Sequence, residues 1–83
     1  MKKKLSEMTY GEEGVVKSIE QALKKQIAGM GIRVGKRVKM ETKQPIKGPV
    51  VIIVEETETS LGLGLANKIL VEVEDEDSLN GSP

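Results

Sequence analysis

Two residue types that carry much of protein chemistry, cysteine and histidine, are missing from this 83-residue chain. Without cysteine there is no disulfide and no thiolate. Without histidine the chain lacks the commonest metal ligand and the usual general base near neutral pH. No paired carboxylates fall in a segment predicted to be structured, so no acid–base pair can be named. The sequence therefore predicts a protein that is not an enzyme and has no cofactor and no metal site.

Aromatic residues and long apolar runs are also nearly absent. Tyr10 is the single aromatic residue, whereas proteins that bind single-stranded nucleic acid normally stack bases on several aromatic side chains. No apolar run is long enough to span a bilayer, and no signal-peptide core follows the basic start. We therefore expect a cytoplasmic protein that reaches a membrane only through a partner, and we expect no nucleic acid partner.

The net charge of zero hides an uneven distribution of charge along the chain. Residues 1–47 carry 12 basic and 5 acidic residues, for a net charge of +7, and residues 48–83 carry 1 basic and 8 acidic residues, for −7. Such a split is typical either of a basic face for an acidic partner or of two halves that neutralise each other within one small fold. We favour the second interpretation.

Both ends have a composition that buries too little apolar surface to offset the entropy of ordering them. We expect residues 1–4 to be a disordered basic start and residues 75–83, which are acidic and then small and polar, to be a disordered tail. One folded domain is expected over residues 5–74, near the lower size limit for a lone hydrophobic core.

The hydrophobic pattern predicts a fold that is mainly β with one α-helix. Five short strands are expected at 14–19, 36–41, 50–54, 59–63 and 69–74, from β-branched runs and period-two alternation. Between the first two, Leu23, Ile27 and Met30 recur at helical spacing over 20–30, and Gly31 follows as a helix stop. Five strands with tight connections in about 70 residues favour a small barrel that leaves few open edges.

The order of glycines and aliphatic residues resembles one known family. The strongest stretch is Met30–Val38, in which glycine, aliphatic, two residues, glycine, two residues and aliphatic follow one another. Around it lie Leu5, Met8, Gly11–Val16, Leu23 and Ile27, then Pro45–Pro49, and finally Leu61, Leu63, Ala66, Ile69 and Val71. This ordered set, over residues 5–73, resembles the FeoA family, the ferrous iron transport protein A.

The resemblance implies an SH3-like barrel and a small cytoplasmic accessory or regulatory protein of ferrous iron uptake. Its partner would be FeoB, a ferrous iron permease with a cytosolic GTPase domain. Two departures concern the contact surface. Gly48 is followed directly by Pro49, where the family often has an acidic residue, and Gly62–Leu65 carries no charge where the family's closing segment usually does.

Five residues are candidates for contact with a partner. Met30, Val51 and Ile53 could line a half-exposed groove, since methionine adapts to partner surfaces. Arg33 and Arg37, the only arginines, are either anchors for an acidic patch or ordinary surface charges. The continuously apolar strand 50–54 is covered on both faces, or it serves a partner or the edge of a homo-oligomer.

Two other functions remain open from the sequence. One is a nucleic-acid-binding SH3-like domain that follows phosphates with its basic half, although the acidic second half would repel them. The other is a stand-alone version of the C-terminal domain of an iron-dependent repressor, although no helix-turn-helix segment is found in these residues.

Overall fold

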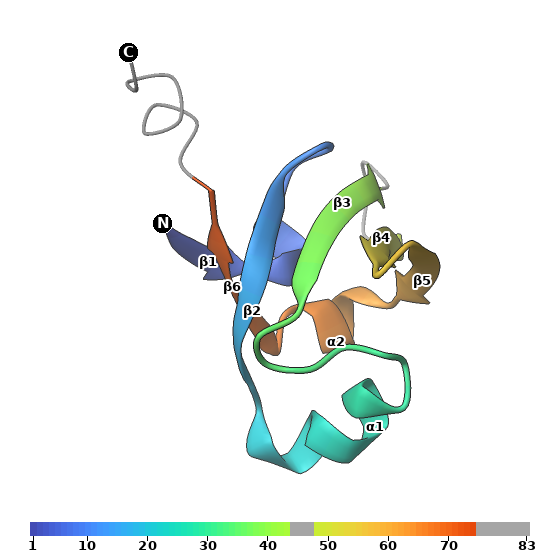
Figure 1. Cartoon of the computed structure of the whole chain (residues 1–83). Coiled ribbons are helices and arrows are strands. Elements are labelled where there is room, and N and C mark those ends of the chain that lie inside the picture. The colour runs from blue at the N-terminus through green and yellow to red at the C-terminus, as the bar shows by residue number, and fades with distance from the viewer. Residues whose placement is uncertain (44–47, 75–83) are drawn as a thin grey trace.

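The computed structural model describes residues 1–43 and 48–74, which form a six-stranded antiparallel sheet and short helical segments (Figure 1). The strands are β1 (Lys2–Lys4), β2 (Glu13–Ile19), β3 (Arg37–Lys43), β4 (Val50–Val54), β5 (Thr57–Leu61) and β6 (Ile69–Val73). The helical segments are the 3-10 turns η1 (Leu5–Glu7) and η2 (Gln21–Leu23) and the helices α1 (Lys24–Ala28) and α2 (Leu63–Ala66). The prediction of a mainly β chain is confirmed.

The strands follow the order β1-β6-β2-β3-β4-β5 across the sheet. β2 lies in the middle and pairs with β6 on one side and β3 on the other. A bulge between Val16 and Ser18 interrupts the β2–β6 register, and another between Met40 and Thr42 interrupts the β3–β4 register. Bulges increase the local twist of a strand, which suits a small sheet that must curve around its own core.

One face of the sheet supplies most of the core. In β4 and β6 every second residue is buried, as period-two alternation predicts. Among the described residues no polar or charged side chain is buried, and the core is aliphatic because the chain offers almost no aromatic residue. The buried set is Leu5, Met8, Val16, Ile19, Ile27, Ile32, Val38, Met40, Val50, Ile52, Val54, Leu61, Ala66, Ile69, Val71 and Val73.

The helix expected over 20–30 is shorter in the structure. β2 runs on to Ile19, the chain then makes the 3-10 turn η2, and α1 ends at Ala28. Of the predicted apolar stripe, Ile27 is fully buried, while Leu23 and Met30 are partly buried and pack against the core. The stripe is therefore mainly structural, as its helical spacing predicts.

The basic start is part of the sheet, so the expected disorder of residues 1–4 is wrong for Lys2–Lys4. β1 pairs antiparallel with β6, Lys3 opposite Val71, and the Val73 N–H donates to the Met1 carbonyl at 2.8 Å. Composition misses this strand because pairing along an edge needs a neighbouring backbone and no apolar side chain. The predicted acidic tail, 75–83, lies outside the described residues, as does the centre of the proline hairpin at 44–47.

β4 does not offer an edge for a homo-oligomer, and that prediction is corrected. Its backbone pairs with β3 on one side and β5 on the other. Among the described residues, the edge strands of the sheet are β1 and β5. The apolar run of β4 instead reflects its central position, with Val51 and Ile53 half-buried on the face opposite the core.

Glu12 connects β1 to the turn before β2. Its carboxylate accepts hydrogen bonds from the Thr9 N–H at 2.7 Å and from Lys3 Nζ at 3.2 and 3.3 Å. Partial burial acts to raise the pKa of Glu12, but these hydrogen bonds and the charge of Lys3 together outweigh burial and hold the pKa below its ordinary value. The ionised carboxylate therefore stabilises the folded state.

We expect the free energy of unfolding to fall as the pH is lowered, because the Glu12 carboxylate becomes protonated. Because the pKa of Glu12 is lower in the folded chain, its contribution is present above the ordinary glutamate pKa and is lost as the pH falls below about 4.5. Glu12→Gln should flatten that part of the stability profile in urea unfolding at pH 3 to 6. An equally steep profile in Glu12→Gln would contradict this role. The control is Glu7→Gln, because the Glu7 carboxylate is exposed and accepts only from the Lys4 N–H.

Candidate functional site

The loop from α1 to β3 is held rigidly and presents one apolar side chain to solvent. Gly31 and Gly35 have φ angles of +85° and +94°, which glycine adopts without steric cost. The Gly35 N–H donates to the Val16 carbonyl at 2.8 Å, so the loop is bonded to β2. Within it Ile32 is fully buried, whereas Val34 is 53% exposed.

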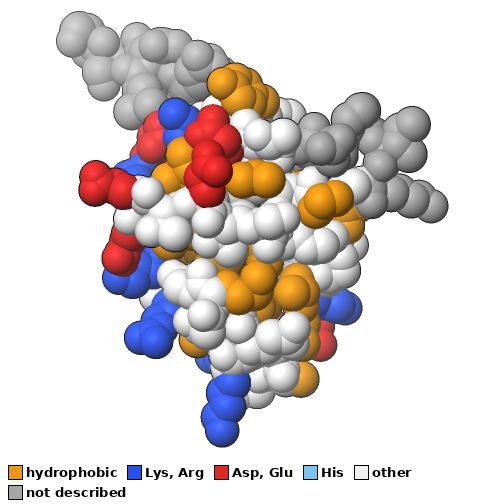
Figure 2. Space-filling view, turned by 90° about the vertical axis from the view of Figure 1, so that its right-hand side faces the viewer, with side chains coloured by type: hydrophobic (Ala, Val, Ile, Leu, Met, Phe, Trp, Pro, Cys, Tyr) orange, Lys and Arg blue, Asp and Glu red, His pale blue; other side chains and the backbone are white. Residues whose placement is uncertain are grey.

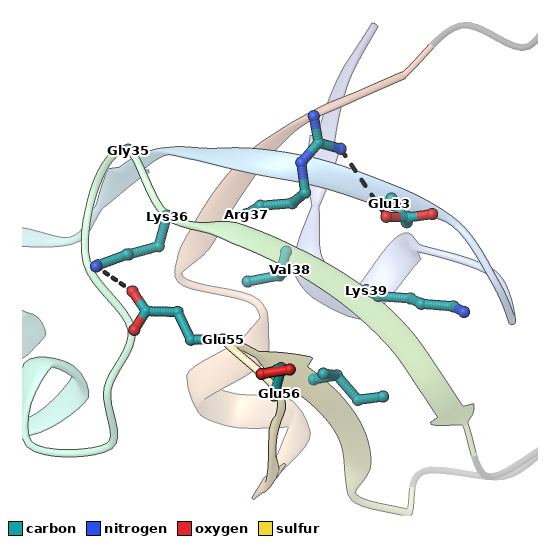
Figure 3. Close-up of a pocket in the computed structure, with 9 residues that line it drawn as sticks. Glu13, Gly35, Lys36, Arg37, Val38, Lys39, Glu55 and Glu56 are labelled. Atoms are coloured by element: carbon teal, nitrogen blue, oxygen red, sulfur yellow. Dashed lines mark hydrogen bonds and ion pairs between the residues drawn. The ribbon is translucent and has the colours of Figure 1, made fainter.

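A hollow on one side of this loop, here called the β3 groove, has a volume of about 340 Å³ (Figure 3). It lies against β3 and the β4–β5 turn, with Ile53 among its apolar lining. Three basic and three acidic residues surround it. The full lining is Glu13, Gly35, Lys36, Arg37, Val38, Lys39, Ile53, Glu55 and Glu56.

Most charges of the β3 groove are matched within the molecule. Lys36 forms an ion pair with Glu55, which lowers the pKa of that carboxyl. Arg37 donates to the Glu74 carboxylate, which raises the pKa of the guanidinium, and its Nη1 lies 3.9 Å from Glu13 Oε1. Two of these pairs, Lys36–Glu55 and Arg37–Glu74, join the basic first half of the chain to the acidic second half. They support the interpretation that the two halves neutralise each other.

A second hollow, here called the α1 groove, lies on the other side of the loop and has a volume of about 300 Å³. Its surface is largely apolar and is flanked by two cations. The lining is Ile19, Lys24, Ala28, Ile32, Arg33 and Val34. Among residues 1–43 and 48–74, neither Lys24 nor Arg33 takes part in an ion pair.

Comparison with known proteins decides the family. The model of the FeoA domain matches residues 3–73. The chain belongs to the FeoA family. A "Putative Fe(2+) transport protein A" of Methanocaldococcus jannaschii is 38% identical over 64 residues, which cover 75% of this chain and 76% of that protein.

Solved FeoA structures show the same fold. A crystal structure of an iron uptake regulatory protein, FeoA, superposes with a TM-score of 0.81 at 30% identity and covers 89% of this chain and 99% of its own. Stenotrophomonas maltophilia FeoA, described as a prokaryotic SH3 domain protein, has a TM-score of 0.71 at 25% identity over 84% of this chain and 89% of its own. The predicted SH3-like fold is confirmed, and FeoA membership makes the chain a non-enzymatic accessory protein linked to ferrous iron transport.

The structure separates the five predicted contact residues of this FeoA chain. Arg37 and Ile53 share the β3 groove, and Arg33 lies in the α1 groove. Val51 lines neither, and Met30 packs against the core with Leu23, Leu63 and Leu65. Figure 2 shows hydrophobic side chains at several places on the face that it presents, among charged side chains.

Sequence reasoning missed Lys24 and Val34 as groove residues. Lys24 lies outside the apolar stripe of the predicted helix, which contains Leu23, Ile27 and Met30. The available signal was the short loop between Gly31 and Gly35, which holds two aliphatic residues. The loop buries Ile32 and leaves Val34 exposed.

The β4–β5 turn of this FeoA chain beside the β3 groove is strained. Glu55 and Glu56 form a two-residue loop with φ angles of 49° and 69°, and Val54 pairs with Thr57 across it. A two-residue hairpin with both φ angles positive is the type I′ turn, which favours Asn-Gly. Side chains with a Cβ are disfavoured in this left-handed region by roughly 1–2 kcal/mol each.

We expect the double variant Glu55→Asn with Glu56→Gly to be more stable than the natural chain by about 1–2 kcal/mol, because it relieves this strain. The lost Lys36–Glu55 pair is exposed, so its removal costs little. A melting temperature raised by roughly 4–8 °C or more would show it. The matched control is Glu58→Gln in β5, and an unchanged or lower melting temperature in the double variant would contradict the strain.

No helix in the described part of the chain is long and apolar enough to cross a membrane.

Proposed function

We propose that this chain regulates ferrous iron uptake by binding the cytosolic part of a FeoB-type permease. The observation that carries the proposal is the FeoA family match over residues 3–73, which leaves little of the described chain outside it. The 38% identity to a protein named for Fe(2+) transport supports the same link. The chain then acts in the cytoplasm, at the inner face of the membrane, through its partner.

The surface around the β3 groove and the α1 groove has the features of a protein contact. Both grooves combine apolar lining with charged borders, as protein interfaces do with their apolar centres and polar rims. Arg33, Arg37 and Ile53 line these grooves and are the contact residues that we retain in this proposal. Met30 and Val51 are half-buried and line neither groove, and we retain them as predicted contact residues from the sequence alone.

Nucleic acid fits this surface less well than a protein does. Lys36 and Arg37 already pair with carboxylates, and Lys3 and Lys68 pair with Glu12 and Glu20. A phosphate backbone would have to compete with these internal carboxylates for the cations.

The test is ferrous iron uptake in the source organism. Deletion of the gene should reduce uptake of labelled ferrous iron, and expression of the natural chain should restore it. The permease solubilised in mild detergent should retain the chain on co-purification. Unchanged uptake in the deletion strain, together with no retention, would refute the proposed function.

A further inference from the structure

The two grooves differ in how far their cations are already satisfied. In the β3 groove Lys36 and Arg37 both face carboxylates of the same molecule. In the α1 groove Lys24 and Arg33 form no ion pair with any described residue. A partner carboxylate would gain more at the second site because it displaces no internal carboxylate there.

The α1 groove also displays an apolar side chain that lies outside the hydrophobic core. Val34 is one of three large hydrophobic residues that are strongly exposed in the described part of the chain, with Met1 and Tyr10. It stands beside the apolar lining from Ile19, Ala28 and Ile32. Because the Gly35 N–H and the Lys36 N–H bond back to Val16 and Arg33, the loop is ordered before any partner binds. Such preorganisation reduces the entropic cost of association.

We propose that the α1 groove binds a short acidic segment that carries an aliphatic side chain. The aliphatic group packs against Val34 and Ala28, and the flanking carboxylates pair with Lys24 and Arg33. A volume of about 300 Å³ lies at the lower end of ligand pockets, which fits one or two side chains rather than a folded surface. The inference rests on the proposed function in one respect: the segment belongs to the cytosolic part of the permease.

A peptide probe tests the chemistry of the groove without the permease. The isotope-labelled full chain is titrated with the hexapeptide Glu-Asp-Leu-Leu-Asp-Glu and followed by amide NMR. We expect saturable shifts at Lys24, Ala28 and the Ile32–Val34 loop, and none from a matched peptide with serine in place of leucine. No saturable shift, shifts centred on Lys39 and Ile53, or the same shifts from inorganic phosphate would overturn the proposal.

Substitutions locate the contact. Val34→Glu and Arg33→Glu should each weaken peptide binding by about tenfold or more, while Tyr10→Glu and Lys17→Glu, at exposed positions outside the groove, should leave it unchanged. All four positions are exposed, so the variants should keep the natural amide spectrum elsewhere. If the folded Val34→Glu and Arg33→Glu variants bind the peptide as tightly as the natural chain does, the proposed site is refuted. Peptide binding without permease binding refutes the proposed function alone, and permease binding without peptide binding refutes the groove alone.

Discussion

Gly14→Ala is expected to lower the free energy of unfolding by about 3 kcal/mol, at the upper end of what overpacking costs. A Cβ at this position would lie 2.5 Å from the Glu72 carbonyl oxygen and 2.6 Å from Val71 Cγ1. The nearest of these atoms belongs to the backbone of β6, and the two strands are paired there, Gly14 opposite Val73. Relief of the clash therefore requires the central strand pair to separate.

Gly64→Ala is the matched control for Gly14→Ala. It lies in α2, and nothing is found within 4 Å of its built Cβ. Alanine is favoured over glycine in a helix by roughly 1 kcal/mol, so this variant should be slightly more stable than the natural chain. Urea unfolding of the three proteins gives the comparison, with equal slopes as the check on two-state behaviour. A loss of less than about 1 kcal/mol in Gly14→Ala would contradict the close approach of β2 and β6.

Ile27→Ala is expected to cost about 2–5 kcal/mol and to loosen the α1 groove as well. Ile27 is the one buried residue of α1 and is 0% exposed. A helix of this length does not hold together alone in water, so its tertiary contact must fix it. The carbonyl of Ile27 also accepts from the Met30 and Ile32 N–H groups at 3.0 and 3.3 Å, which ties the loop to the same anchor.

Two measurements separate the effects of Ile27→Ala. Urea unfolding gives the loss of global stability, and amide hydrogen exchange of residues 30–36 reports local opening of the loop. The neighbouring Gln26→Ala is at an exposed position of the same helix. It should change the free energy of unfolding and the free energy of local opening by no more than about 0.5 kcal/mol each. Natural exchange rates in a folded Ile27→Ala protein would show that the loop does not depend on α1.

The strands were the part of this fold most open to prediction. β4 and β6 are rich in β-branched residues, and Ile69, Val71 and Val73 alternate in β6, so both could be recognised within one residue of their observed bounds. β1 could not, because three lysines carry no hydrophobic pattern and the strand exists only through backbone pairing with β6. The helix was overextended because its apolar spacing continues through Met30, whereas the chain makes the 3-10 turn η2 before α1 and turns at Gly31.

The candidate site was predicted only in part, for a geometric reason. Arg33 and Arg37 are close in sequence and were treated as one pair of charges. Gly35, with a φ of +94°, turns the chain between them, so Arg33 lines the α1 groove and Arg37 the β3 groove. Met30 is partly buried and packs against the core, so core packing accounts for its side chain, and its contact with a partner stays a prediction.

The most direct measurement is an amide NMR titration of this chain with the cytosolic GTPase domain of the FeoB-type permease from the same organism. We predict saturable shifts that cluster on Lys24, Ala28 and the Ile32–Gly35 loop and that are lost in Val34→Glu. An absence of shifts at high partner concentration, or shifts confined to other surfaces, would contradict the account.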